Sequence, residues 1–187
     1  MSSAFYFLLI LSTACSSDYS PKPVGHFRID IPTSNYQLYD AFQNFEFALS
    51  DQAQIVNFPQ NEAADFFNIV YPQLNAEIYC SYTVFEENDF MQLAEGFRRF
   101  VYVHASKADA IIPKAFENPE QKVYGLVYDI KGNVASSTQF VLTDSVSSFF
   151  RAALYFDHTP NQDSIAPVLE YINKDIQILI ESFRWKK

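Results

Sequence analysis

The clearest chemistry in this sequence is at Cys15, which follows an apolar run and three small residues. Residues 4–11 form the unbroken apolar run, and Ser12, Thr13 and Ala14 separate it from the cysteine. Crossing a bilayer takes about 20 apolar residues, so the run fits the hydrophobic part of a secretory signal instead. A small residue directly before a cysteine suits cleavage and acylation at that thiol, and buried acyl chains attach a chain to a membrane.

The leader departs from a typical lipoprotein signal in two ways. No basic residue precedes the apolar run, which leaves open a start upstream of Met1. Ser12 stands where a leucine is usual, and Leu11 lies one position earlier. An ordinary secretory signal, in which Cys15 is incidental, therefore stays open as the alternative.

The segment after Cys15 has the composition of a tether. Residues 16–25 are mainly small or polar and include two prolines, so they cannot form a core. We therefore expect a signal peptide at residues 1–14, a lipidated N-terminus with a flexible tether at 15–26, and a single α+β domain at 27–187. No second apolar stretch is long enough to cross a membrane.

The other residues with nucleophilic or metal-binding chemistry are scattered. Cys80 lies in an alternating, strand-like segment, where a lone cysteine usually packs as a small apolar residue; a reactive thiol is the alternative. His26, His104 and His158 form no pair at the spacing of one helical turn. We therefore expect neither a metal site nor a cofactor.

Charged side chains form no recognisable catalytic pattern either. Glu86 and Glu87, with Asp157 and Asp163, stand at predicted loop edges, where carboxylates are usually solvated. Arg151 lies among aromatic residues of a predicted strand and is interpreted as an ion-paired or interface residue. The sequence contains no phosphate-binding glycine loop, nucleophile elbow or zinc-protease motif. It therefore predicts a protein that is not an enzyme.

Composition indicates an acidic protein rich in sheet. The 187 residues include 19 Phe and 12 Tyr, and aromatic residues favour half-buried strands. The formal net charge is −9, and no basic stripe alternates with aromatic residues. Because such a chain repels a phosphate backbone, nucleic-acid binding is not expected.

Hydrophobic patterns predict a succession of strands, at residues 45–49, 53–58, 66–71, 76–85, 110–116, 123–130, 134–142 and 149–156. Turn residues at 72–75 and 131–133 predict antiparallel hairpins. The side chains of residues 143–145 are expected to accept hydrogen bonds from backbone N–H groups. One alternating set is expected to form a buried face, namely Ile78, Cys80, Tyr82 and Val84.

A central helix is predicted after these first strands. Asp89 is expected to cap it through its side chain. Its apolar stripe, at spacings of three and four, comprises Phe90, Leu93, Ala94, Phe97, Val101 and His104. Since His104 continues this stripe, it is interpreted as a histidine packed at the edge of the core.

A long amphipathic helix is predicted at the C-terminus. Asp163 or Ser164 is expected to cap it, with Pro167 in the first turn and an apolar stripe from Ile165 to Phe183. Basic residues are expected at the negative end of its dipole, namely Arg184, Lys186 and Lys187. Together the elements predict an α+β fold in which a mainly antiparallel sheet is packed by the central helix and the C-terminal helix.

Several segments carry a resemblance to a known family. They are Tyr19–Pro32, Lys107–Ile111, Val123–Ser136, Gln139–Ser145, Phe149–Phe156 and Asp163–Val168. In this order they resemble the gliding-motility lipoprotein GldD family of the Bacteroidota. The resemblance covers essentially the whole chain after the leader. The order of elements is also similar to that of the PsbP/Mog1-like α/β/α sandwich, which is an analogy of architecture alone.

The family resemblance implies an envelope lipoprotein needed for gliding and for the associated type IX secretion machinery. It implies lipid attachment at Cys15, a position at the outer membrane facing the periplasm, and other gliding or secretion envelope proteins as partners. It implies no known enzymatic activity, and no catalytic residue carries over to this chain.

Two functions remain to be distinguished. The first is a non-catalytic module that contacts other motility or secretion components while held at the membrane. The alternative is a small-ligand or cell-wall-binding periplasmic domain with weak hydrolase activity, in which an aromatic-rich sheet lines a groove. A deep pocket with converging polar groups would favour the alternative, and a flat surface would favour the first.

Overall fold

The computed structural model describes residues 32–57, 65–157 and 162–186 of the chain. Its strands are β1 Tyr36–Tyr39, β2 Phe45–Ser50, β3 Gln54–Asn57, β4 Asp65–Tyr71, β5 Ala76–Val84, β6 Ala110–Asn118, β7 Val123–Lys131, β8 Ser136–Thr143, β9 Ser148–Phe156 and β10 Arg184–Trp185. Its helices are the short 3-10 helix η1 Glu87–Asp89 and the α-helices α1 Phe90–Tyr102 and α2 Gln162–Ser182.

The strands of the described residues form two antiparallel sheets. The large sheet has seven strands in the order β3-β4-β5-β9-β8-β7-β6, and the small sheet has three in the order β1-β2-β10. Hairpins join most neighbours, but β5 and β9 lie side by side although α1 and three strands separate them in sequence. The predicted α+β class, with a mainly antiparallel sheet, is confirmed.

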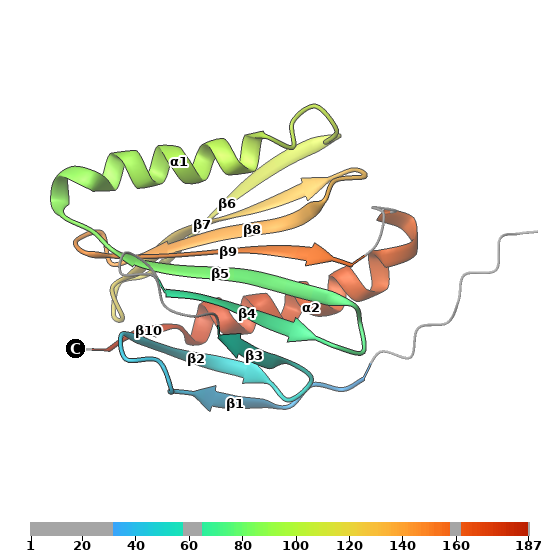
Figure 1. Ribbon diagram of the computed structural model, residues 1–187, viewed down its shortest axis with the longest axis horizontal. Helices are drawn as coiled ribbons and strands as arrows, with labels where there is room; N and C mark the ends of the chain where they lie inside the picture. Colours follow the sequence, from blue (N-terminus) through green and yellow to red (C-terminus); the bar gives the residue numbers. More distant parts are fainter. Residues whose placement is uncertain (1–31, 58–64, 158–161, 187) are drawn as a thin grey trace, which may run out of the picture.

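The two α-helices lie on opposite faces of the large sheet (Figure 1). Helix α2 and the small sheet cover one face, and α1 crosses the other. The α2 stripe packs onto the sheet because its buried residues recur at the spacing of a helical turn, namely Val168, Ile172, Ile176, Leu179 and Ile180. Among the described helices, none combines the length and the apolar character that a bilayer crossing needs.

A stack of phenylalanine rings fills the space between the large sheet, the small sheet and the end of α2. The ring centroid of Phe45 lies 5.4 Å from that of Phe150 and 5.4 Å from that of Phe183. Phe150 and Phe183 are in turn 5.2 Å apart, and all three side chains are fully buried. The high phenylalanine content therefore serves this core, because each ring removes a large apolar area from water.

The predicted turns are confirmed in detail. Gly132 has a φ of +107°, a conformation that favours glycine, between β7 and β8. In the β8–β9 turn, Asp144 Oδ1 accepts hydrogen bonds from the backbone N–H groups of Val146, Ser147 and Ser148 at 2.8–2.9 Å. Burial opposes ionisation of Asp144, but these donors outweigh it and hold the pKa of the carboxyl below its ordinary value.

The prediction of a buried face on β5 is confirmed at the centre of the strand and wrong at its C-terminal end. Ile78, Cys80 and Tyr82 are buried against α2, but Val84 is 64% exposed because the strand leaves the core there. The opposite face is not uniformly exposed either, since Ser81 is buried at 7% exposure.

Several predicted helix details are wrong. Asp89 precedes α1 but makes no capping hydrogen bond, because the preceding residues already form a 3-10 turn. Helix α1 ends at Tyr102, so His104 lies beyond the helix rather than on its stripe. Helix α2 begins at Gln162, which places Pro167 inside the helix and not in its first turn. Asp163 and Ser164 come after Gln162 and so lie inside the helix, which means that neither stands at the predicted capping position before its first residue.

The C-terminal basic residues do not complement the dipole of α2. The chain leaves the helix after Ser182 and forms β10. In this strand the backbone of Arg184 lies opposite that of Glu46 in β2. Lys186 then donates from Nζ to the carbonyl oxygens of Asp40 and Phe42. Lys187 lies outside the described residues. Both short strands, β1 and β10, escaped prediction because four and two residues are too few to show a periodicity.

Candidate functional site

The predicted attachment residue, Cys15, lies outside the described residues, as do His26 and His158. Lipidation at Cys15 therefore stays a prediction. The described residues contain no group of three or more His, Cys, Asp or Glu side chains arranged to hold a metal ion.

Cys80 and His104 are both packed residues. Cys80 is 4% exposed on the core side of β5, and burial raises the pKa of its thiol well above the ordinary value. A thiolate is the reactive form of cysteine, so this burial disfavours a nucleophilic role. His104 is half-buried, and burial lowers the pKa of its imidazole. The interpretation of Cys80 as a packing residue is confirmed, whereas His104 is partly buried but lies beyond the α1 stripe on which its interpretation rested.

Of the four candidate carboxylates, the structure describes the side chains of Glu86 and Asp157. Glu86 and Asp157 are exposed. Glu86 lies after the end of β5, and Asp157 lies after the end of β9. The side chains of Glu87 and Asp163 are outside the described residues. Nothing in the described geometry converts these acids into a catalytic pair.

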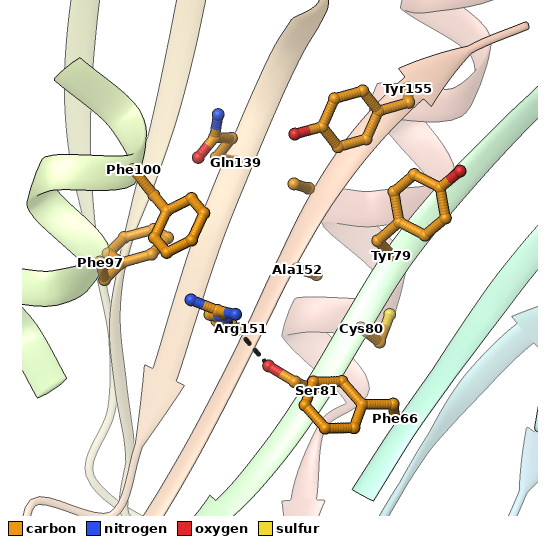
Figure 2. Close-up of a pocket in the computed structure, with 11 residues that line it drawn as sticks. Phe66, Tyr79, Cys80, Ser81, Phe97, Phe100, Gln139, Arg151, Ala152 and Tyr155 are labelled. Carbon is orange, nitrogen blue, oxygen red and sulfur yellow. Dashed lines mark hydrogen bonds between the residues drawn. The ribbon is translucent and has the colours of Figure 1, made fainter. Parts of the chain in front are cut away.

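Arg151 is the sequence candidate that the structure places in a hollow. A groove of about 260 Å³ lies between α1 and the strands β4, β5, β8 and β9 (Figure 2). Its lining residues are Phe66, Tyr79, Cys80, Ser81, Phe97, Phe100, Gln139, Arg151, Ala152, Ala153 and Tyr155. Most of these lining residues are aromatic or aliphatic, and among those that the structure describes Arg151 alone is charged.

The groove exists because α1 covers only part of its face of the sheet. Phe97 and Val101 of α1 are buried with residues of β7, β8 and β9, including Tyr128 and Val141. On β5 and β9, the neighbouring positions carry the small side chains of Ser81 and Ala153, which leave the sheet surface low beside the helix. The remaining floor is therefore open to solvent.

Strand register explains the position of Arg151. It points away from the phenylalanine core because its neighbours Phe150 and Ala152 point into that core. Arg151 lies directly opposite Ser81 of β5, and its Nε donates to the Ser81 hydroxyl oxygen at 3.0 Å. Its guanidinium carbon lies 4.7 Å from the centroid of the Phe100 ring, a cation–π contact.

The Arg151 guanidinium is partly desolvated, and no carboxylate among the described residues pairs with it. Burial lowers its pKa below the ordinary value. The ion pairs formed by the described residues join other groups, such as Arg98 with Glu95 on α1 at 3.0 Å. The expectation that Arg151 is an ion-paired residue is therefore wrong within the described residues, and its interface alternative stays open.

Aromatic rings rise on both sides of this cation. Tyr79 and Tyr155 contact each other from neighbouring strands, with ring centroids 5.0 Å apart. Phe66, Tyr79 and Phe100 are 40%, 48% and 57% exposed, which is high for large apolar side chains. Exposed apolar side chains gathered around a hollow typically mark an interaction site.

A second unusual group is the buried carboxylate of Asp175 on α2. Its oxygens accept hydrogen bonds from the hydroxyl groups of Tyr36 at 2.6 Å, Tyr71 at 3.2 Å and Ser34 at 3.2 Å. Burial and the bond to Asp175 raise the pKa of Tyr36 to about 12, and burial and the charge of Asp175 also raise that of Tyr71. The three hydroxyl donors satisfy the carboxylate, so the cluster fastens the start of β1 to α2 and β4.

The sequence patterns indicated neither the Asp175 cluster nor the aromatic walls of the groove. A signal for Asp175 was available, because it stands three residues after Ile172 and four before Leu179 and so falls on the buried side of the helix. No comparable signal existed for the groove. Its walls come from α1 and from strands that are distant in sequence, and only the packing of α1 brings them together.

The polar groups that the described residues give to the groove can hold a bound group through charge and hydrogen bonds. The Ser81 hydroxyl accepts a hydrogen bond from Arg151, and no histidine or carboxylate of the described residues contacts it as a base. An aromatic hollow with one guanidinium instead suits an apolar group that carries a negative charge.

Comparisons with known proteins agree with the resemblance found in the sequence. A family model described as the gliding motility lipoprotein GldD matches residues 16–185. No curated protein sequence matches the chain. The matched range begins just after Cys15 and includes both α-helices and both sheets. On this match, the chain belongs to the GldD family of gliding-motility lipoproteins.

Proposed function

We propose that this protein is a non-catalytic component of the gliding machinery and of the associated type IX secretion machinery, held at the membrane by lipid on Cys15. The family match over residues 16–185 is the observation on which the proposal rests. Family membership gives a role in gliding motility and the character of a lipoprotein. The secretion role, the outer-membrane position facing the periplasm and the non-catalytic action go further and are proposals.

The proposed layout has a leader at residues 1–14, a lipidated tether at 15–26 and a folded body from residue 27. The apolar leader and the small residues before Cys15 support the cleavage position. The start of the family match at residue 16 agrees with it. We further propose that the folded domain has a PsbP/Mog1-like architecture. The position of helices on both faces of its antiparallel sheet supports this proposal.

Non-catalytic action is supported by the chemistry of the groove. Of the described lining residues, Cys80 keeps its thiol on the core side of β5 with a pKa raised by burial, and the Ser81 hydroxyl accepts a hydrogen bond from Arg151. Neither arrangement activates a nucleophile. In this proposal the protein acts by binding other proteins of the cell envelope. Its own attachment to the membrane holds it close to them.

Substitution of the two cysteines tests the proposal. With Cys15→Ser as the only copy in the cell, the protein should lose incorporation of labelled palmitate and leave the membrane fraction. Gliding and secretion should fail while the domain still folds. Cys80→Ala is the matched control, because it removes a thiol from the core and leaves the acylation site intact. Normal gliding and secretion with unlipidated Cys15→Ser protein would contradict the anchoring proposal.

The alternative, a ligand-binding periplasmic domain, gains support from the groove around Arg151. It differs from the first proposal in the nature of the partner and not in the position of the site. Cross-linking in the intact envelope distinguishes them. Recovery of other envelope proteins at the groove supports the machinery component, and recovery of cell-wall fragments alone supports the alternative.

A further inference from the structure

The Arg151 guanidinium has unused hydrogen-bonding capacity that faces a groove. Within the described residues its hydrogen bond runs from Nε to Ser81, so both Nη groups keep their donors for another partner. The Phe100 ring packs against the guanidinium, while Ser81 holds it from the strand beside it (Figure 2). The side chain is therefore fixed in position before any partner arrives.

Among the described residues no carboxylate accepts from Arg151, which is unexpected in so acidic a protein. The chain has 22 acidic residues against 13 basic ones, and α1 itself carries Glu95. Glu95 nevertheless pairs with Arg98, on the exposed part of the helix. Arginine presents a planar fork of donors that matches a carboxylate, which makes a carboxylate the natural complement of the free Nη groups.

The size and the walls of the groove limit what accompanies that carboxylate. At about 260 Å³ the groove is smaller than typical small-molecule sites, which span about 300–1,000 Å³. It has room for one or two side chains, and Phe66, Tyr79 and Phe100 give it apolar walls. An apolar side chain that fills it would exclude water and strengthen the neighbouring ion pair.

Charge argues against a membrane surface as the occupant. Anionic headgroups repel a body of net charge −9, and Arg151 is a single cation recessed among aromatic rings. A recessed cation can select one carboxylate at short range, while salt screens the repulsion from charges that lie more than a Debye length away.

We propose that the groove between α1 and strands β5 and β9 binds a segment of a partner protein in which an acidic residue stands next to an apolar residue, the carboxylate pairing with Arg151. The apolar side chain enters between Phe100 and Tyr79. The proposal adds the chemistry of the partner to the proposed function. Only the statement that this partner is an envelope protein rests on the proposed function.

Direct binding to the full-length protein in detergent micelles tests the inference. The probe is the capped pentapeptide with the sequence Gly-Leu-Asp-Phe-Gly, and its matched control has Asn in place of Asp. Titration is followed by NMR, through the Arg151 Nε–H resonance and the backbone amides of β5 and β9. We expect saturable shifts at these positions, with the Asn peptide binding about tenfold more weakly or worse because it loses a charge-assisted contact.

Variants of the protein make the result specific. Arg151→Gln should weaken binding of the Asp peptide to the level of the Asn peptide, whereas Arg98→Gln, which removes an exposed arginine of α1, should leave it unchanged. Phe100→Ala removes an exposed ring and so keeps the fold, but it should also weaken binding. Equal affinity for both peptides, or no loss with Arg151→Gln, would overturn the inference.

Two further probes separate other occupants of the groove. Decanoate tests a free fatty carboxylate, and phosphatidylglycerol vesicles test an anionic membrane. Tighter binding of either one than of the Asp peptide at Arg151 would overturn the choice of a protein segment. Since the assay measures binding alone, its failure leaves the Cys15→Ser test of the proposed function unaffected.

Discussion

The two faces of the seven-stranded sheet differ in how completely they are covered. On the face toward α2 and the small sheet, the inward residues of β4, β5, β8 and β9 are almost fully buried, namely Phe67, Ile69, Ile78, Phe140, Leu142, Phe150 and Leu154. On the face toward α1, the helix covers β7 and β8 but leaves aromatic side chains of β4 and β5 partly exposed.

This difference separates stability from binding. A side chain that is already buried contributes its full transfer free energy to folding, whereas an exposed one contributes little. Phe66 and Phe100 therefore add little to folding, although they line the groove around Arg151. Substitutions on the two faces should affect different measurements, and the following predictions run from the largest expected change in stability to the smallest.

The largest loss of stability is expected from Phe150→Ala. The Phe150 ring is fully buried and contacts Phe45, Phe67, Phe140 and Phe183. Its removal leaves a cavity in the core, which costs about 3–5 kcal/mol in the free energy of unfolding. Denaturant unfolding followed by circular dichroism measures the loss. A loss below about 1 kcal/mol, the size expected of a surface change, would show that this face is not the main source of stability.

A smaller loss is expected from Asp175→Ala, which removes the shared acceptor of Tyr36, Tyr71 and Ser34. The partly buried hydroxyl donors then lack an acceptor, which lowers the free energy of unfolding by about 2–3 kcal/mol in total. The loss is not larger because some of these donors regain hydrogen bonds with water. Asp175→Asn keeps one acceptor oxygen and should lose less. The same denaturant measurement checks both variants, and an unchanged unfolding midpoint for Asp175→Ala would show that the cluster does not fasten β1.

Alkaline pH should weaken the same cluster. The pKa of Tyr36 is raised from 10.0 to about 12 in the folded protein, since burial and the bond to Asp175 favour the neutral phenol. A raised folded pKa adds stability that is fully present below pH 10 and is lost as pH rises through about 12. Unfolding free energies across this range should therefore fall more steeply for the wild type than for Tyr36→Phe. Parallel curves would contradict the prediction.

The smallest change in stability is expected in the groove. Phe100→Ala removes a ring that is 57% exposed, so the free energy of unfolding should change by about 0.5 kcal/mol or less. Thermal unfolding of Phe100→Ala beside Phe150→Ala measures the contrast between the two faces in one experiment. Similar losses in the two variants would remove the proposed division between stability and binding.

Local structure was predictable from the sequence where one segment contained the whole signal. The β4–β5 hairpin, the apolar stripe of α2 and the Asp144 turn each depend on residues that are close in the chain. The pairing of β5 with β9 depends on the competition of all strands for neighbours, which no single segment specifies. The two short strands β1 and β10 form only because β2 offers both of its edges.

The candidate site was predictable in part. The aromatic flanks of Arg151 indicated an interface residue, but an ion pair was an equal interpretation. The choice between an ion pair and an interface role depends on which side chains lie close to Arg151. That in turn depends on how α1 packs on the sheet. Asp175 shows the same limit in reverse, because its place on the helix was visible while its hydroxyl partners come from β1 and β4.

The colony-spreading rate of cells whose only copy carries Arg151→Gln tests the central claim most directly, namely that the face toward α1 acts by binding. Arg98→Gln is the control, and the amount of protein in the envelope is measured in both strains. We expect spreading to fail with Arg151→Gln at a normal protein level and to continue with Arg98→Gln. Normal spreading with Arg151→Gln, or a defect explained by a fallen protein level, would contradict the claim.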